Sequence, residues 1–208
     1  MNVKEAYNSW ADQYDSNTNK TRDLEAVSLR ATLSNIEFDS CLEIGCGTGK
    51  NTEWLLTKAN IITAVDLSNE MLAKAKQKIN SEKVEFCQAD ITEKWTFVNK
   101  SYDLVTFSLV LEHIENLDEI FQKVSKATNS NGIIYIGELH PFKQYSGTKA
   151  RFDSKEGQQI VTCFNHNISD FTQTAKTNGF EIIHINEYFD ENDRTNIPRI
   201  LTVLLKKR

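Results

Sequence analysis

Short apolar runs, bounded by polar or glycine-containing turns, recur along most of the chain. Runs of this kind predict strands that are buried on both faces of a sheet. We predict seven of them, at residues 40–45, 61–67, 84–91, 102–110, 132–139, 180–189 and 199–207. The fifth begins at the Asn131-Gly132 turn, and only the polar stretch DENDRTN separates the last two. Such a short connection favours an antiparallel pair at one edge of the sheet.

Amphipathic segments alternate with these runs and predict helices. The predicted helices cover residues 24–33, 50–58, 69–79 and 117–128, and a further one runs from Ile168 to an end at Gly179. Ser68 precedes the third of them and is a typical N-cap residue. Near the N-terminus, Tyr7, Trp10 and Tyr14 share one face of a helix if that helix continues so far.

This alternation predicts an α/β fold of the Rossmann-like kind, with a mostly parallel seven-stranded sheet and helices on both faces. We expect one compact domain, in which residues 1–35 form a helical lid segment and residues 36–208 form the binding domain. Sheets of this kind bind ligands beyond the carboxyl ends of their strands. The residues directly after each strand are therefore the candidate site.

Composition narrows the class of ligand. The chain has 208 residues, a net charge of -5 and a sequence pI of about 5.5, so no overall positive field attracts nucleic acid. Its four cysteines form no CxxC pair and have no histidine cluster near them, so we expect no metal site and no disulfide framework. The polar N-terminus and the absence of a long apolar run predict a cytoplasmic protein that does not bind membranes.

The stretch LEIGCGTGK holds the densest group of glycines. A dinucleotide-binding turn needs a third glycine where Lys50 stands, and a P-loop needs Ser or Thr where Asn51 stands and a glycine five residues before Gly49. Both patterns fail, and E-x-G-x-G-x-G remains. An acid at Glu43, two residues before Gly45, repels pyrophosphate and suits a cationic or hydroxyl-bearing ligand.

The ends of the next strands carry matching chemistry. Asp66 can accept hydrogen bonds from ribose hydroxyls, and Asp90 can accept one from an adenine amino group. Ile91 and Met71 can pack against the two faces of the ring, and the backbone at Ser108 can line an amino-acid portion. Together these residues predict a site for a nucleoside that carries a cation and no phosphate.

LEIGCGTGKNT, VDLSNEML, CQADI and YDLVTFSLVLEHI resemble, in order and spacing, the motifs of class I S-adenosylmethionine (SAM)-dependent methyltransferases of the small-molecule, UbiE/MenG-like type. The resemblance implies SAM as the methyl donor and S-adenosylhomocysteine (SAH) as the product. It implies cofactor contacts from Glu43, Gly45, Cys46 (through its backbone), Gly47, Asp66, Leu67, Met71, Asp90 and Ile91. Gly49, Asp90 and Met71 also have purely structural readings, as a packing glycine, a turn cap and a core side chain.

The N-terminal aromatic residues resemble the lid helix of small-molecule methyltransferases. Tyr7 and Trp10 are then expected at the substrate and Tyr14 at the cofactor, where an aromatic face stabilises a sulfonium. Arg22 can pair with the carboxylate of SAM. The alternative is that the rings only dock a helix onto the domain and that the arginine is solvated.

Fewer sequence features indicate which residues bind the methyl acceptor. His140 is the first candidate for a general base because it follows the fifth strand, with Glu138 on the same side as a substrate-binding residue. His113, after the fourth strand, is a further substrate-binding candidate. Structural roles for both histidines, a strand-end turn and helix packing, remain open. HPFKQYSGTKARFDS (140–154) is long enough to form a substrate-specific flap.

The sequence lacks the Pro-Pro-Tyr and Pro-Cys motifs of enzymes that methylate nucleic-acid bases. The prediction is transfer of a methyl group to the oxygen or nitrogen of a small molecule. The alternatives are a methyltransferase acting on RNA or protein, and a domain that binds SAM without catalysis.

Overall fold

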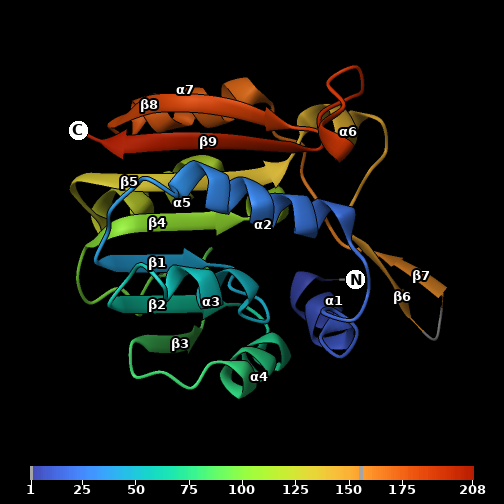
Figure 1. Ribbon diagram of the computed structural model, residues 1–208, viewed down its shortest axis with the longest axis horizontal. Coiled ribbons are helices and arrows are strands. Elements are labelled where there is room, and N and C mark those ends of the chain that lie inside the picture. Colours follow the sequence, from blue (N-terminus) through green and yellow to red (C-terminus); the bar gives the residue numbers. More distant parts are fainter. Residues whose placement is uncertain (1, 155–156) are drawn as a thin grey trace.

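The computed structural model describes residues 2–154 and 157–208. In these parts of the chain seven strands form one sheet in the order β3-β2-β1-β4-β5-β9-β8 (Figure 1). Their bounds are β1 Ser40–Ile44, β2 Ile61–Asp66, β3 Val84–Gln88, β4 Tyr102–Ser108, β5 Thr128–Leu139, β8 Phe180–Tyr188 and β9 Ile200–Lys207. The strands from β3 to β5 run parallel, whereas β9 pairs antiparallel with both β5 and β8. The predicted fold class, with its antiparallel edge pair, is confirmed.

Helices cover both faces of this sheet. Their bounds are α1 Val3–Trp10, α2 Lys20–Leu33, α3 Lys50–Leu55, α4 Asn69–Lys78, α5 Leu117–Ala127, α6 Pro141–Tyr145 and α7 Ile168–Thr177. Helices α2, α3 and α4 pack on one face, and α5 and α7 pack on the other. Alternation along each strand supplies both cores: Tyr135 of β5 faces α2, whereas its neighbours Ile134 and Ile136 face α5.

Capping residues set the starts of several helices. The side chain of Ser68 accepts a hydrogen bond from the Met71 N–H, which confirms the predicted N-cap of α4. Helix α2 begins at Lys20, earlier than predicted, because Asn19 caps the N–H groups of Thr21 and Arg22. Both caps fix the N-terminal ends of helices, and these ends lie at the edge of the sheet where the parallel strands end.

Two parts of the chain differ from the prediction. Helix α1 ends at Trp10, so Tyr14 lies in the turns that follow it and not on the helix itself. The stretch 140–154, expected as a flap, contains the short helix α6 and β6 Arg151–Ser154, and β6 pairs with β7 Gly157–Ile160 in a hairpin. The helix α6 has five residues and each strand of the hairpin has four, which is too short to show an apolar pattern.

Figure 1 shows α1 and the β6–β7 hairpin beyond the end of the sheet to which the arrows of β1 and β4 point. Ala6 and Trp10 of α1 pack against Met71 of α4 and Val161 after β7, in a small apolar cluster separate from the two main cores. These elements therefore stand over the carboxyl edge, where the candidate site is expected. No helix in the described parts of the chain combines the length and apolar character needed to span a membrane.

Candidate functional site

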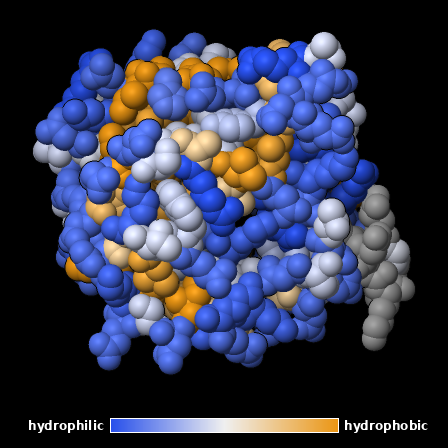
Figure 2. Space-filling model, in the orientation of Figure 1, coloured by the Kyte–Doolittle hydropathy of each residue, from blue (hydrophilic) through white to orange (hydrophobic). Residues whose placement is uncertain are grey.

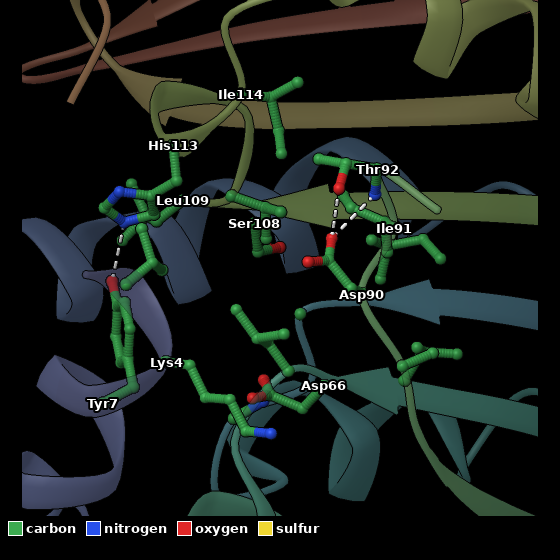
Figure 3. Close-up of a pocket in the computed structure, with 18 of the residues that line it drawn as sticks. Lys4, Tyr7, Asp66, Asp90, Ile91, Thr92, Ser108, Leu109, His113 and Ile114 are labelled. Atoms are coloured by element: carbon green, nitrogen blue, oxygen red, sulfur yellow. Dashed lines mark hydrogen bonds between the residues drawn. The ribbon is translucent and has the colours of Figure 1, made fainter. Parts of the chain in front are cut away.

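A cavity of about 460 Å³ lies beyond the carboxyl ends of β1, β2 and β4 (Figure 3). The residues around it come from the start of α1, from Tyr14, and from the turns after β1, β2, β3 and β4. Residues predicted as cofactor or substrate contacts that line it are Tyr7, Tyr14, Gly45, Gly47, Asp66, Leu67, Asp90, Ile91, Ser108 and His113. The volume is within the range of sites for small ligands, which is roughly 300–1,000 Å³.

The glycine turn after β1 forms one wall of the cavity. Gly45 has a φ of 75°, and a Cβ atom on it would lie 2.1 Å from Cγ2 of Val110. Both the backbone conformation and the close approach of Val110 therefore require glycine. The N–H groups of Gly45 and Cys46 donate to the carbonyl of Val65, which holds the turn against β2. Gly49 instead packs against Ala75 and Ile79 around the end of α4, as its structural reading proposes.

Asp66 lies at the point where β2 ends and connects two parts of the wall. Its Oδ2 accepts a hydrogen bond from the N–H of Gly47 at 2.8 Å, and its Oδ1 accepts one from the N–H of Ser68 at 2.8 Å. Burial raises the pKa of this carboxyl, and these N–H donors oppose the rise because they favour the charged form. Asp66 is therefore held in one orientation, with carboxylate lone pairs at the cavity wall.

Asp90 and Ile91 line the next section, after β3. Oδ1 of Asp90 accepts hydrogen bonds from the backbone N–H and the hydroxyl of Thr92, at 2.9 and 2.6 Å. The other carboxylate oxygen points toward the middle of the cavity (Figure 3). Asp90 thus caps a turn and presents an acceptor to a ligand at the same time.

Tyr7 and His113 close the opposite side, near the segment after β4. The Tyr7 hydroxyl lies 2.9 Å from Nε2 of His113, and the two rings meet edge to face with their centres 5.5 Å apart (Figure 3). The Nδ1 atom of His113 lies 2.8 Å from the carbonyl oxygen of Thr162. Burial strongly raises the pKa of Tyr7, so its phenol stays protonated.

Four predicted cofactor residues do not line the cavity, although one of them, Arg22, supports its wall. Arg22 donates to the carbonyl oxygens of Tyr14 and Asn17 and lies over the Tyr14 ring, so it holds a lining residue in place and does not face a SAM carboxylate. Glu43 points toward α3 and accepts a hydrogen bond from the Thr52 hydroxyl at 2.6 Å. Burial raises the pKa of Glu43 to about 8, so it is largely protonated at neutral pH.

The other two are core residues. The side chain of Cys46 packs in the core beneath α3, and its backbone connects the lining residues Gly45 and Gly47. Met71 is fully buried against α1, in the cluster with Ala6 and Trp10, and not against the cavity. Its structural reading as a core side chain is therefore the one the geometry supports.

Three residues predicted to bind or activate the methyl acceptor, Trp10, Glu138 and His140, also do not line the cavity. Trp10 is buried in the cluster between α1 and α4. Glu138 is buried behind the wall, where its Oε1 accepts hydrogen bonds from the N–H groups of Val110 and Leu111 at 2.9 and 2.8 Å. It thereby fixes the backbone that follows β4 and does not contact a substrate in the cavity.

His140, the sequence-based candidate for the general base, caps α6. Its Nδ1 accepts a hydrogen bond from the Phe142 N–H at 3.2 Å, and its Nε2 lies 3.0 Å from Oε1 of Glu187 on β8. Since the cavity is lined by other residues, His140 has the structural role of joining β5, α6 and the edge strand. His140 therefore does not stand where a general base at the cavity would.

Several lining residues follow from no motif of the sequence. Asn2, Val3 and Lys4 come from the start of α1, where the helical spacing between Lys4 and Tyr7 could have placed them on one face. Leu109, next to the predicted Ser108 at the end of β4, also lines the cavity and adopts a φ of 57°, which is rare for a residue with a branched side chain.

A carboxylate, an imidazole and a thiol meet next to the cavity. Atoms of Glu112, His113 and Cys163 that could bind a metal lie within 4.8 Å of one another. However, Nδ1 of His113 is already bonded to the Thr162 carbonyl, and burial raises the pKa of the Cys163 thiol to about 12. In this arrangement the protonated thiol and the occupied nitrogen are poor metal ligands.

The fold and site define a nucleoside-binding α/β protein, with a glycine turn after the first strand and carboxylates after the second and third. Residues 42–136 match the family described as a methyltransferase domain. This part of the chain, a little under half of its length, is therefore a methyltransferase domain of the class I SAM-dependent type.

A curated relative agrees with this assignment. A malonyl-[acyl-carrier protein] O-methyltransferase of Priestia megaterium is 28% identical over 169 residues, which cover 79% of this chain and 56% of that protein. The chain thus spans little more than half the length of this curated relative.

Solved structures share the fold. A putative SAM-dependent methyltransferase of Listeria monocytogenes has a TM-score of 0.75 at 23% identity, covering 89% of this chain and 99% of that one. The N-methyltransferase NodS of Bradyrhizobium japonicum, in complex with SAH, has a TM-score of 0.69 at 16% identity, covering 97% of this chain and 98% of that one.

Proposed function

We propose that this protein uses SAM to methylate a small-molecule acceptor at oxygen or nitrogen. The observation that carries the proposal is the convergence of Gly45 and Gly47, Asp66, Asp90 and Ser108 on one cavity, from the ends of four neighbouring strands. Each group has the chemistry that one portion of the cofactor requires, and none is a phosphate-binding group.

The residues around the cavity fit SAM portion by portion. Asp66 accepts from the ribose hydroxyls, because its orientation is fixed by two backbone N–H groups and its remaining lone pairs are available. Asp90 accepts from the adenine amino group, and Ile91 packs on the ring. The absence of side chains at Gly45 and Gly47 leaves room for the amino-acid portion.

When bound, SAM supplies an activated methyl group on a sulfonium, which reacts by in-line displacement. The task of the protein is then to align the acceptor and to exclude water. Tyr7 and Tyr14 stand at the wall and offer aromatic surface toward a cation. Of the expected lid segment 1–35, we propose that α1 and the Tyr14 turn cover the site. Helix α2, by contrast, is a core helix whose Leu29 and Leu33 are fully buried.

A small acceptor suits the size of the site. The cavity of about 460 Å³ leaves limited space beside a nucleoside of the size of SAM. Figure 2 shows a largely hydrophilic face on which hydrophobic side chains lie in separate patches, and the net charge of the chain is -5. Neither feature favours a macromolecular acceptor such as RNA. The relatives include enzymes named for O-methylation and for N-methylation, so both acceptor atoms stay within the proposal.

Isothermal calorimetry with SAH and SAM tests the cofactor assignment. We expect saturable binding of both, weakened about tenfold to a hundredfold in Asp66→Asn, because a hydrogen bond to a charged group contributes about 1.5–3 kcal/mol. Asp193→Asn is the matched control, since Asp193 caps an exposed turn far along the chain. Absence of a saturable heat with the wild-type chain would contradict the proposal.

Transfer of labelled methyl groups from SAM into a cell extract, separated by size, tests the acceptor class. Label confined to low-mass products supports a small-molecule acceptor. Label in RNA or protein replaces it with a macromolecular one, and no transfer by a chain that binds SAM indicates a binding domain without catalysis.

A further inference from the structure

We infer that Tyr7 and His113 form a proton relay that accepts the proton of the methyl acceptor, and that this acceptor is a hydroxyl or an amine and not a carboxylate. The inference rests on the proposed methyltransferase function and adds the catalytic groups and the substrate class to it. It arises from the hydrogen-bond geometry at the acceptor side of the cavity.

The partners of His113 determine which of its nitrogens carries the proton. A backbone carbonyl can only accept a hydrogen bond, so Nδ1, 2.8 Å from the Thr162 oxygen, must be the donor. In the neutral imidazole Nε2 is then an acceptor, and the Tyr7 hydroxyl, 2.9 Å away, donates to it. The hydrogen bonds therefore run in one direction, from Tyr7 through His113 to the backbone.

Both side chains stand at the cavity. Tyr7 projects from α1, and His113 projects from the short 3-10 helix Leu111–His113 that follows β4 (Figure 3). Since the Tyr7 proton is directed to Nε2, the lone pairs of its oxygen are available to a donor in the cavity. A hydroxyl or amine of the acceptor is such a donor, whereas a carboxylate is not.

The relay balances the reaction. A lone pair on the acceptor oxygen or nitrogen forms the bond to the methyl carbon, and the carbon–sulfur bond breaks with its electron pair going to sulfur. The acceptor proton passes to the Tyr7 oxygen while the Tyr7 proton passes to Nε2 of His113. The products are the methylated acceptor, a neutral thioether and an imidazolium.

The surroundings of His113 accommodate that imidazolium. The Thr162 carbonyl accepts from Nδ1–H in both charge states, and the Glu112 carboxyl lies close by. Because burial strongly raises the pKa of Tyr7, the phenol does not retain the negative charge. It passes a proton on to His113 as it receives one from the acceptor. His113 is only partly buried, which gives the proton a route to solvent.

Nitrogen-15 NMR of the imidazoles in the full chain, with and without SAH, tests the geometry without an acceptor. We expect His113, assigned by its loss in His113→Gln, to be the Nδ1–H tautomer, with an Nε2 resonance that shifts in Tyr7→Phe and not in Tyr145→Phe. An Nε2–H tautomer, an Nε2 resonance that Tyr7→Phe leaves unchanged, or a metal-bound Nδ1 after addition of Zn²⁺ would each overturn the relay.

Methyl transfer into the low-mass fraction of a cell extract, at saturating SAM, tests the chemistry. We expect a rate about a hundredfold to ten-thousandfold lower in His113→Gln and at least about tenfold lower in Tyr7→Phe. The KM for SAM should be unchanged. Added imidazole should partly restore His113→Ala, and His184→Gln, on the edge strand, should behave like the wild type. Variants that transfer at the wild-type rate contradict the relay alone, whereas a wild-type chain that transfers nothing contradicts the proposed function.

The pH profile of that rate gives a further readout. Because the relay needs a neutral imidazole, the pH profile of the wild type should have a rising limb that is absent in His113→Gln. The other charged or titratable groups around the pair are Lys4, Tyr14, Asp66, Glu112 and Cys163. A limb that persists in His113→Gln would assign the proton to one of these groups and overturn the relay. Methylation confined to carboxylic acids among the labelled products would contradict the substrate class.

Discussion

The carboxylate of Asp66, at the end of β2, accepts a hydrogen bond from the N–H of Gly47, in the turn after the neighbouring strand β1, at 2.8 Å. The same carboxylate accepts from Ser68, which caps α4. One side chain thus joins two strand ends and the start of a helix. The proposed contact with ribose therefore falls on a carboxylate whose orientation the backbone fixes.

Because Asp66 has this structural role, its loss should also lower stability. Asp66→Ala leaves the N–H groups of Gly47 and Ser68 without their acceptor, and an unsatisfied buried group costs about 1–3 kcal/mol. We expect the free energy of unfolding, from urea denaturation, to fall by about 2–3 kcal/mol, reduced in part by relief of the desolvated charge. Asp66→Asn keeps one oxygen acceptor and should lose less. Equal stability of the alanine variant and the wild type would show that water replaces these bonds.

Gly45 and Gly179 together allow two costs of a glycine-to-alanine substitution to be measured separately. One is the strain of the left-handed backbone, and the other is the clash of the new Cβ with a neighbouring side chain. Gly45 and Gly179 have φ values of 75° and 85°, but a Cβ on Gly45 would lie 2.1 Å from Val110, whereas one on Gly179 would have no atom within 4 Å. Gly179→Ala should therefore cost about 1–2 kcal/mol, the price of the left-handed conformation alone. Gly45→Ala should cost clearly more and abolish SAH binding, as measured by denaturation and calorimetry. Similar losses in both variants would mean that Val110 moves away freely.

Buried carboxyl groups predict how stability changes with pH. Burial, and then the charge of Glu112, raise the pKa of Glu138 to about 8, far above its unfolded value of about 4.3. Between these two values the folded state holds a proton that the unfolded state has lost, so the stability falls as the pH rises. The slope for this group is at most about 1.4 kcal/mol per pH unit.

Glu138→Gln removes that contribution. The amide oxygen can still accept from Val110 and Leu111, so between about pH 5 and 8 the free energy of unfolding should fall less steeply in Glu138→Gln than in the wild type. Glu43 contributes to the slope of both proteins, so only the difference between them reports Glu138. Glu181→Gln, at an exposed position of β8, is the control. Parallel pH curves would show that Glu138 is ionised in the folded protein.

The strands of the main sheet could be predicted because each is an apolar run with clear boundaries. The hairpin and α6 could not be, because they are short and because the chain after the hairpin is held by residues far away in sequence, as Val161 is in its cluster with α1. The start of β5 was predicted at Gly132, but pairing with β4 extends it to Thr128 across a bulge that a left-handed Asn131 permits.

In the site, too, residues placed by the strand pattern could be predicted, whereas contacts between residues distant in sequence could not. Asp66, Asp90 and Ser108 could be predicted at the cavity because the carboxyl ends of parallel strands meet there whatever the details of packing. Side-chain direction was harder to predict: Glu43, only two residues before Gly45, points to α3. Partners distant in sequence, such as His140 and Glu187, leave no local pattern that would reveal their contact.

His140 and His113 give the sharpest test of what the structure adds to the sequence. His140 is fully buried and joins α6 to Glu187 of β8, and burial lowers its pKa. His140→Gln removes this link, so we expect a loss of about 1–3 kcal/mol in the free energy of unfolding. At a temperature where the variant is folded, its rate of methyl transfer should stay within about twofold of the wild type, since no part of His140 lines the cavity. His113→Gln should show the reverse, a small change in stability and a large loss of rate. If His140→Gln instead loses rate without losing stability, the base is His140, and the segment after β5 must move toward the cavity when the acceptor binds.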